Sequence, residues 1–144
     1  MANVASILKD KPAGGTVYAV DPDLPVLEAI KRMADHGVGA LLVMKGDELV
    51  GVLSERDYAR KVILMGRASA STAVREIMSS PVISVTRDHS VQECMQIITD
   101  RRIRHLAVVE GEKVLGLISI GDCARSMLAE QRQLIEQLEN YVRG

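Results

Sequence analysis

Aromatic residues are nearly absent from this 144-residue chain, which contains no Phe, no Trp and three Tyr. Because 47% of the residues are hydrophobic, the chain can still build a core, and we expect that core to be aliphatic. Proteins that bind single-stranded nucleic acid usually stack the bases on aromatic side chains. The scarcity of aromatic residues therefore argues against that class of function.

An excess of charge of one sign is also missing, since 18 basic and 19 acidic side chains leave a net charge of −1. Bulk attraction to nucleic acid or to an anionic membrane is therefore not expected. No apolar run approaches the roughly 18 residues of a transmembrane helix. The N-terminus also lacks the apolar stretch of a signal peptide. We expect a cytoplasmic protein with no membrane or nucleic-acid partner.

Cysteine is scarce as well. Cys94 and Cys123 lack the CxxC spacing of a metal or redox site, and both fall at small apolar positions of expected helices, which predicts reduced, buried thiols. The three histidines are not spaced as metal ligands, and the glycine patterns of phosphate-binding loops are missing. We therefore expect no metal site, no required cofactor, no catalytic residues and no enzymatic activity.

The chain does contain an internal repeat. Residues 17–63 align without a gap on residues 82–128 when they are shifted by 65 positions, and 14 of the 47 pairs are identical. Roughly three identities would arise by chance from ordinary residue usage. The two copies therefore predict a duplicated structural unit.

Each copy has the same expected order of elements. A short extended segment precedes a helix with apolar residues at helical spacing, and two apolar strands follow, joined by a tight turn at Gly46 or Gly111. A second helix ends the copy. One copy of about 50 residues would be marginally stable alone. We therefore expect an α/β (α+β) fold in which two βαββα repeats pack about a pseudo-two-fold axis.

The remaining segments lie outside the two copies. The expected parts are an N-terminal flank with the first repeat at 1–65, a linker at 66–80, the second repeat at 81–128 and a C-terminal amphipathic helix at 129–144. Apolar residues fall on one face of this last helix and extend into the turn before it, namely Leu128, Ile135, Leu138 and Val142. This stripe either covers its own domain or pairs with a second chain, and the sequence leaves both possibilities open.

The second hairpin strand of each copy ends in the pattern hydrophobic-Gly-hydrophobic-hydrophobic-Ser-x-x-Asp, with Ser54 and Asp57 in one copy and Ser119 and Asp122 in the other. One interpretation is a helix N-cap, because serine accepts a backbone N–H and aspartate favours the first turn. The other is a ligand site. A carboxylate can accept two hydrogen bonds from a ribose diol, and the glycine lets a ligand approach the strand.

With this motif in both copies, residues 16–128 resemble a tandem pair of CBS domains, the Bateman module named after cystathionine β-synthase. The likeness is greatest to small stand-alone bacterial pairs. The resemblance implies that the cleft between the copies binds AMP, ADP, ATP, S-adenosylmethionine or NAD(H). It also implies that Asp57 and Asp122 hold the ribose, with Ser54 and Ser119 beside them.

The resemblance implies the remaining contacts too. Arg56, Arg104 and His105 would converge on a phosphate near Asp57, which makes that site the better equipped of the two for phosphate. Apolar residues would form the adenine pocket, although each is also an ordinary core residue. The candidates are Tyr18, Val38, Ala40 and Val52 for one site, Ile83, Ile103, His105 and Leu117 for the other, and Thr16 in addition.

The sequence therefore predicts a non-enzymatic sensor of AMP or another adenosine-containing ligand, such as ATP or NAD(H). It would modulate an unidentified partner protein and form a homodimer through the repeat helices and the C-terminal helix. The alternative is a constitutive dimeric interaction scaffold with degenerate ligand sites.

Overall fold

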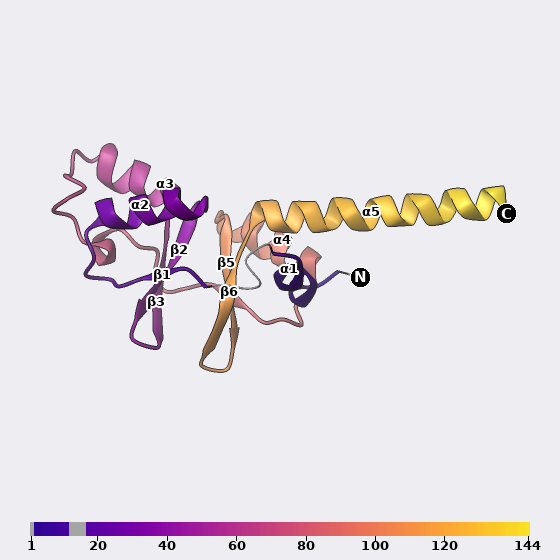
Figure 1. Cartoon of the computed structure of the whole chain (residues 1–144), viewed down its shortest axis with the longest axis horizontal. Coiled ribbons are helices and arrows are strands. Elements are labelled where there is room, and N and C mark those ends of the chain that lie inside the picture. Colours follow the sequence, from indigo (N-terminus) through magenta and orange to yellow (C-terminus); the bar gives the residue numbers. More distant parts are fainter. Residues whose placement is uncertain (1, 12–16) are drawn as a thin grey trace.

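The computed structural model describes residues 2–11 and 17–144. Two three-stranded sheets lie side by side, and a long helix extends away from them (Figure 1). Up to the linker the elements are α1 (Val4–Asp10), β1 (Ala19–Val20), α2 (Val26–His36), β2 (Ala40–Lys45), β3 (Glu48–Ser54), α3 (Glu55–Tyr58) and the π-helical turn η1 (Ala59–Ile63). The later elements are the 3₁₀ turn η2 (Val74–Glu76), β4 (Ser84–Val85), α4 (Val91–Arg101), β5 (His105–Glu110), β6 (Lys113–Ser119) and α5 (Ile120–Arg143).

The two sheets have the same topology and the same register. In each, a short strand pairs in parallel with the first hairpin strand, which pairs antiparallel with the second, giving the orders β1-β2-β3 and β4-β5-β6. Ala40 lies opposite Ser54, and His105 lies opposite Ser119 at the equivalent place. Each hairpin also has its irregularity at the same position. The predicted duplication and βαββα repeats are confirmed.

Each repeat has its own aliphatic core. The first contains Val20, Val26, Ala29, Met33, Leu41, Val43, Leu53, Val62, Val74 and Ile77. The second contains Val4, Ile7, Val85, Val91, Cys94, Ile98, Leu106, Val108, Ile118 and Cys123. Both cysteines are free and buried, as the sequence predicted.

The segment before the first repeat packs on the second repeat. Val4 and Ile7 of α1 belong to the second core, as Val74 and Ile77 of the linker belong to the first. A bridge joins Asn3 to Ser90, and the equivalent bridge joins Ala73 to Pro25. The linker and the N-terminal segment are thus structurally equivalent. The linker packs on the repeat that it follows in the chain, whereas the N-terminal segment precedes the first repeat and packs on the second.

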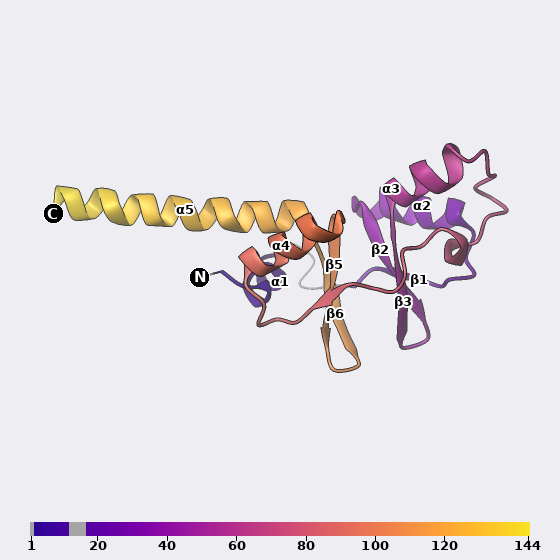
Figure 2. The same cartoon turned by 180° about the vertical axis from the view of Figure 1, so that it is seen from behind.

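Helix α5 has 24 residues, which corresponds to roughly 36 Å at 1.5 Å per residue. Both views show that its C-terminal part extends well beyond the two sheets (Figures 1 and 2). The apolar stripe at Leu128, Ile135, Leu138 and Val142 is between 53% and 84% exposed. The sequence left open whether this stripe covers its own domain or pairs with a second chain, and the exposure shows that it does not cover its own domain.

Among the helices of the described residues, none combines the length and the hydropathy of a membrane span.

Candidate functional site

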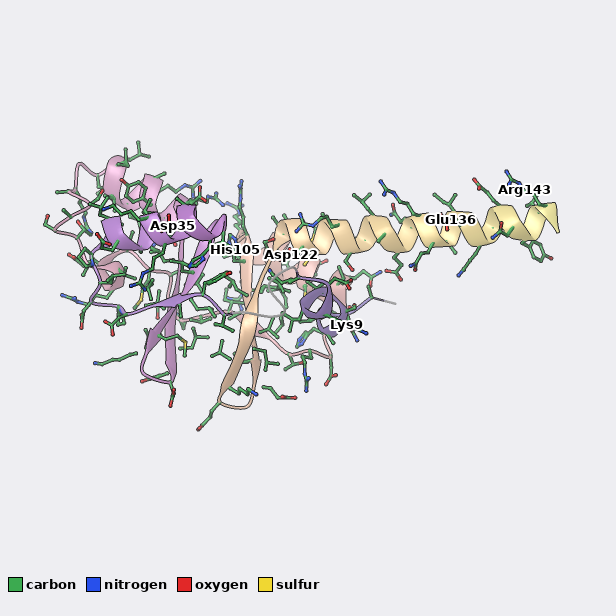
Figure 3. The ribbon with its side chains drawn as sticks, viewed as in Figure 1. Lys9, Asp35, His105, Asp122, Glu136 and Arg143 are labelled. Carbon is green, nitrogen blue, oxygen red and sulfur yellow. The ribbon has the colours of Figure 1, made fainter. Side chains whose placement is uncertain are left out.

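Two cavities lie at the junction of the repeats. The first, here called the Asp57 cavity, has a volume of about 390 Å³. The second, the Asp122 cavity, has a volume of about 580 Å³. Both fall within the range of roughly 300–1,000 Å³ that is typical of small-molecule sites. Gly39 and His105 line both cavities, which places the two sites next to each other. Figure 3 shows His105 and Asp122 where the two repeats meet.

Each cavity takes its walls from both repeats. In the Asp57 cavity, the Ser-x-x-Asp motif of the first repeat faces Ile83, Ile103 and neighbouring residues of the second. In the Asp122 cavity, the motif of the second repeat faces Tyr18 and Val38 of the first. Tyr18 and Ile83 are 65 positions apart, as are Val38 and Ile103, so the two cavities are related by the pseudo-two-fold axis. A ligand in either cavity would contact both repeats.

This crossing regroups the adenine-pocket candidates. Val52 lies with Ile83 and Ile103 in the Asp57 cavity, and Leu117 lies with Tyr18, Val38 and Ala40 in the Asp122 cavity. The sequence grouping had placed Val52 with the residues of the first repeat and Leu117 with those of the second. The difference arises because the second hairpin strand of one repeat faces the segments that precede the first strand and follow the first helix of the other repeat. Thr16 lies outside the described residues.

The motif forms the predicted helix cap in both repeats. Asp57 N–H donates to Ser54 Oγ at 3.1 Å, and Ser54 N–H donates to Asp57 Oδ2 at 3.0 Å. At the start of α5, Asp122 N–H donates to Ser119 Oγ at 3.1 Å, and Ser119 N–H donates to Asp122 Oδ2 at 2.9 Å. These reciprocal bonds fix each carboxylate at a cavity wall. The capping and ligand interpretations are therefore compatible, because one oxygen caps the helix while the other is directed elsewhere.

The glycine of the motif has a role that the sequence interpretation missed. A Cβ atom at Gly51 would lie 2.6 Å from Sδ of Met78, and one at Gly116 would lie 3.1 Å from Cδ2 of Leu8. Neither glycine lines a cavity. The absent side chains make room for Met78 of the linker and Leu8 of α1, and not for a ligand.

The Asp57 cavity is rich in guanidinium groups. Arg56, Arg104 and His105, which the sequence proposed for phosphate, all line it, and so do Arg60 and Arg102. In the described part of the chain, none of these four arginines forms an ion pair with a carboxylate. Arg60 and Arg102 were not among the predicted site residues. The cavity therefore offers several unpaired cations to an anionic ligand.

The Asp122 cavity contains a lysine that sequence reasoning also missed. Lys11 Nζ donates to Asp122 Oδ2 at 2.8 Å and to the Leu117 carbonyl at 2.9 Å. Arg125 Nη2 donates to Asp122 Oδ1 at 2.6 Å. Burial alone would raise the pKa of Asp122, but the hydrogen bonds from Lys11 and Ser119 and the nearby ammonium charge hold it below its usual value. This carboxylate is therefore ionised at neutral pH.

His105 lies between the two carboxylates. Burial lowers its pKa most strongly, and the charges of Lys11 and Arg104 lower it further, against the opposing effects of Asp122 and Asp57. The surroundings of His105 therefore disfavour the charged form of its imidazole. Among the described residues, no cluster of three or more His, Cys, Asp or Glu could hold a metal ion.

A family model for the CBS domain matches the chain twice, over residues 6–63 and 74–129. The chain belongs to the CBS-domain family. The Arabidopsis thaliana CBS domain-containing protein CBSX3, mitochondrial, is 41% identical over 141 residues, which are 94% of this chain and 68% of that protein. This agreement confirms the resemblance that the sequence motifs indicated.

Solved structures agree with the fold. A protein with CBS domains from Burkholderia ambifaria is 50% identical, with a TM-score of 0.86 over 90% of this chain and 96% of that one. The CBS domain pair of protein MJ0100, solved in complex with 5′-methylthioadenosine and S-adenosyl-L-methionine, is 23% identical, with a TM-score of 0.78 over 90% of this chain and 98% of that one. At that identity the likeness to MJ0100 concerns the fold.

Proposed function

We propose that this protein is a non-enzymatic sensor that binds an adenine nucleotide between its two CBS repeats. The observation that carries the proposal is the paired arrangement of the cavities. Each places a helix-capping aspartate opposite apolar residues of the other repeat. A carboxylate suits a ribose diol, and apolar walls suit an adenine ring.

The ligand that we propose is AMP or another adenosine-containing phosphate, such as ATP or NAD(H). The charge of the Asp57 cavity supports an anionic ligand, because five basic side chains outnumber the two acidic ones there. These side chains are Arg56, Arg60, Lys61, Arg102 and Arg104 against Glu55 and Asp57. The complex of the MJ0100 pair, which shares this fold, supports an adenosine moiety.

Calorimetric titration of AMP into the full chain tests the proposal. Asp57→Ala and Asp122→Ala should each weaken binding in their own cavity by about ten-fold or more, since each removes charge-assisted hydrogen bonds. Asp47→Ala, at an exposed turn position between β2 and β3, is the matched control and should leave binding unchanged. Unchanged AMP affinity in both cavity variants, or no AMP binding to the wild type, would refute the proposal.

Nucleotide binding would act on a partner through the arrangement of the repeats. Because each cavity has walls from both repeats, a bound ligand favours the arrangement in which both walls touch it. We therefore assign the protein a regulatory role toward a partner protein.

The exposed stripe of α5 supports assembly with a second copy of the chain. Leu128, Ile135 and Val142 recur every seven residues, and Leu138 lies beside them, which is the spacing of a helix that pairs with another helix. A two-fold dimer would cover each stripe with its equivalent. Sedimentation equilibrium should give a dimer, and Leu138→Glu should give a monomer, whereas Gln137→Glu should not. A monomeric wild type at micromolar concentration would contradict the dimer.

The same stripe is the observation that favours the alternative, a constitutive scaffold without a ligand. Thermal unfolding separates the two functions. A ligand at 100 times its dissociation constant stabilises a protein by about 2.7 kcal/mol. A shift with AMP supports the sensor, and a dimer that shows no shift with AMP, ATP, NAD(H) or S-adenosylmethionine supports the scaffold.

A further inference from the structure

Asp122 already holds a cation from another part of the chain. Lys11, which directly follows α1, brings its ammonium to 2.8 Å from Asp122 Oδ2 and to 2.9 Å from the carbonyl of Leu117. The lysine side chain is 33% exposed and the aspartate side chain 10%. The two contacts place the ammonium at the wall where a ribose diol would bind in the proposed function.

Asp57 has a different set of partners among the described residues, and its lysine, Lys61, also donates to the carbonyl of Ile77 at 2.9 Å. There the linker brings the hydroxyl of Ser79 to 3.3 Å from Asp57 Oδ1. Lys61 lies 3.3 Å from the same oxygen, but it comes from the same helical segment as Asp57 and is 45% exposed. A hydroxyl can rotate to donate to another acceptor, whereas a lysine from a separate segment that is displaced from a largely buried carboxylate loses its charged partner. The two aspartates therefore present different obstacles to a ligand.

Displacing Lys11 has a consequence for ligand choice. An uncharged nucleoside that takes the Asp122 carboxylate leaves the ammonium without an anionic partner. A nucleotide brings a phosphate into the same cavity, and lysine, on its flexible four-carbon stem, can turn to that phosphate while the diol takes the carboxylate. The exchange then keeps both charges paired.

We propose that Lys11 is the specificity-determining residue of the Asp122 cavity, and that it selects adenosine ligands that carry a phosphate over uncharged ones. This inference rests on the proposed function. It concerns only the Asp122 cavity, and it assigns a ligand-selecting role to the N-terminal segment, which packs on the second repeat through α1.

Calorimetry on the full chain carrying Asp57→Ala, which weakens the first cavity, tests the inference with adenosine and AMP as probes. AMP should bind at least about ten-fold more tightly than adenosine. Adding Lys11→Met should strengthen adenosine binding and weaken AMP binding, so that the ratio of the two affinities falls by about ten-fold. Lys11→Arg keeps the charge and should retain the preference.

Lys9→Met is the matched control, because Lys9 is an exposed lysine in the last turn of α1 that lines neither cavity. Thermal unfolding of each variant checks that α1 remains in place. AMP binding with an unchanged affinity ratio in Lys11→Met, or an equal change in Lys9→Met, would overturn the role of Lys11 and leave the proposed function intact. Absence of binding of both probes to the Asp57→Ala chain would overturn the proposed function of this cavity together with the inference.

Discussion

Arg102 adopts a backbone conformation that disfavours every residue except glycine and, to a lesser degree, asparagine. It ends α4 in the left-handed region, with φ 54° and ψ 43°, and Gly37 ends α2 at the equivalent position with φ 65° and ψ 35°. The second repeat thus has an arginine at a left-handed helix end, where the first repeat has glycine, the residue that adopts this conformation most easily. The guanidinium lines the Asp57 cavity, which gives a reason for retaining the strain.

The substitution Arg102→Gly should therefore raise stability and lower affinity together. A left-handed conformation costs a residue with a Cβ roughly 1–2 kcal/mol. Glycine also adds about 0.5–1 kcal/mol of unfolded-state entropy. The net gain should be about 0.5–1 kcal/mol, or roughly 2–4 °C in Tm. Loss of one charge-assisted contact should weaken AMP binding by about ten-fold.

Two further variants separate these effects, with urea unfolding for stability and calorimetry for AMP. Arg102→Ala removes the guanidinium but keeps the Cβ, so it should lose affinity without gaining stability. Arg101→Ala removes an exposed charge next to it that does not line the cavity, and should change neither by much. If Arg102→Gly is no more stable than Arg102→Ala, the strain argument is wrong. If Arg102→Ala binds AMP like the wild type, the ligand role of Arg102 is wrong.

Three further perturbations test the rest of the structure. Burial lowers the pKa of His105, so the unfolded chain takes up a proton before the folded chain does when the pH falls below the ordinary value of ~6.5, and stability falls. In urea unfolding, His105→Gln should therefore lose less stability than the wild type between pH 7.5 and 5.5. Equal losses would contradict this. Gly51→Ala should destabilise the fold by about 1–3 kcal/mol, because its Cβ would lie 2.6 Å from Met78 Sδ. Gly116→Ala should destabilise it less, because the nearest atom there, Leu8 Cδ2, lies 3.1 Å away. A larger loss of stability in Gly116→Ala than in Gly51→Ala would refute the argument. Ile7→Ala should cost about 2–5 kcal/mol and should lower hydrogen-exchange protection in β5 and β6 more than in β2 and β3, because Ile7 belongs to the second core.

The features that the sequence predicted well are those that recur at a constant offset. The 65-residue shift identified both repeats, both Ser-x-x-Asp caps and the common order of elements. These predictions depended on local patterns and on the likeness between the copies, which a single sequence displays in full. The resemblance to the CBS family, and not the shift, suggested that Arg56, Arg104 and His105 lie near Asp57, and the structure places all four at one cavity.

The features that were missed depend on how the repeats face each other. The N-terminal segment matches the linker at an offset of 70 residues, as Val4 and Val74 show, so a gapless search at 65 positions does not find it. The spacing of Val4 and Ile7, which equals that of Val74 and Ile77, was the available signal. Without this equivalence, nothing along the chain indicates that Lys11 reaches Asp122.

The duplicated scaffold and the unequal cavities have a common explanation. The residues that keep the two repeats alike lie in the cores, the hairpins and the helix caps, where any difference would disturb packing. The differences collect at the end of α2 or α4 and the start of the next strand, where Gly37, Gly39 and Ala40 of one repeat become Arg102, Arg104 and His105 of the other. These positions line cavities and contribute little to the cores.

Because the walls cross between the repeats, a change in one repeat alters the cavity that contains the aspartate of the other. The arginines of the second repeat thus equip the Asp57 cavity, and Lys11, joined along the chain to the first repeat, equips the Asp122 cavity. His105 lines both cavities, and the charges of Asp57 and Asp122 act on it in the same direction. A nucleotide phosphate that enters either cavity changes the charge that His105 experiences and therefore the environment of the other cavity. The two sites are for this reason expected to respond to each other, and not to bind as independent copies.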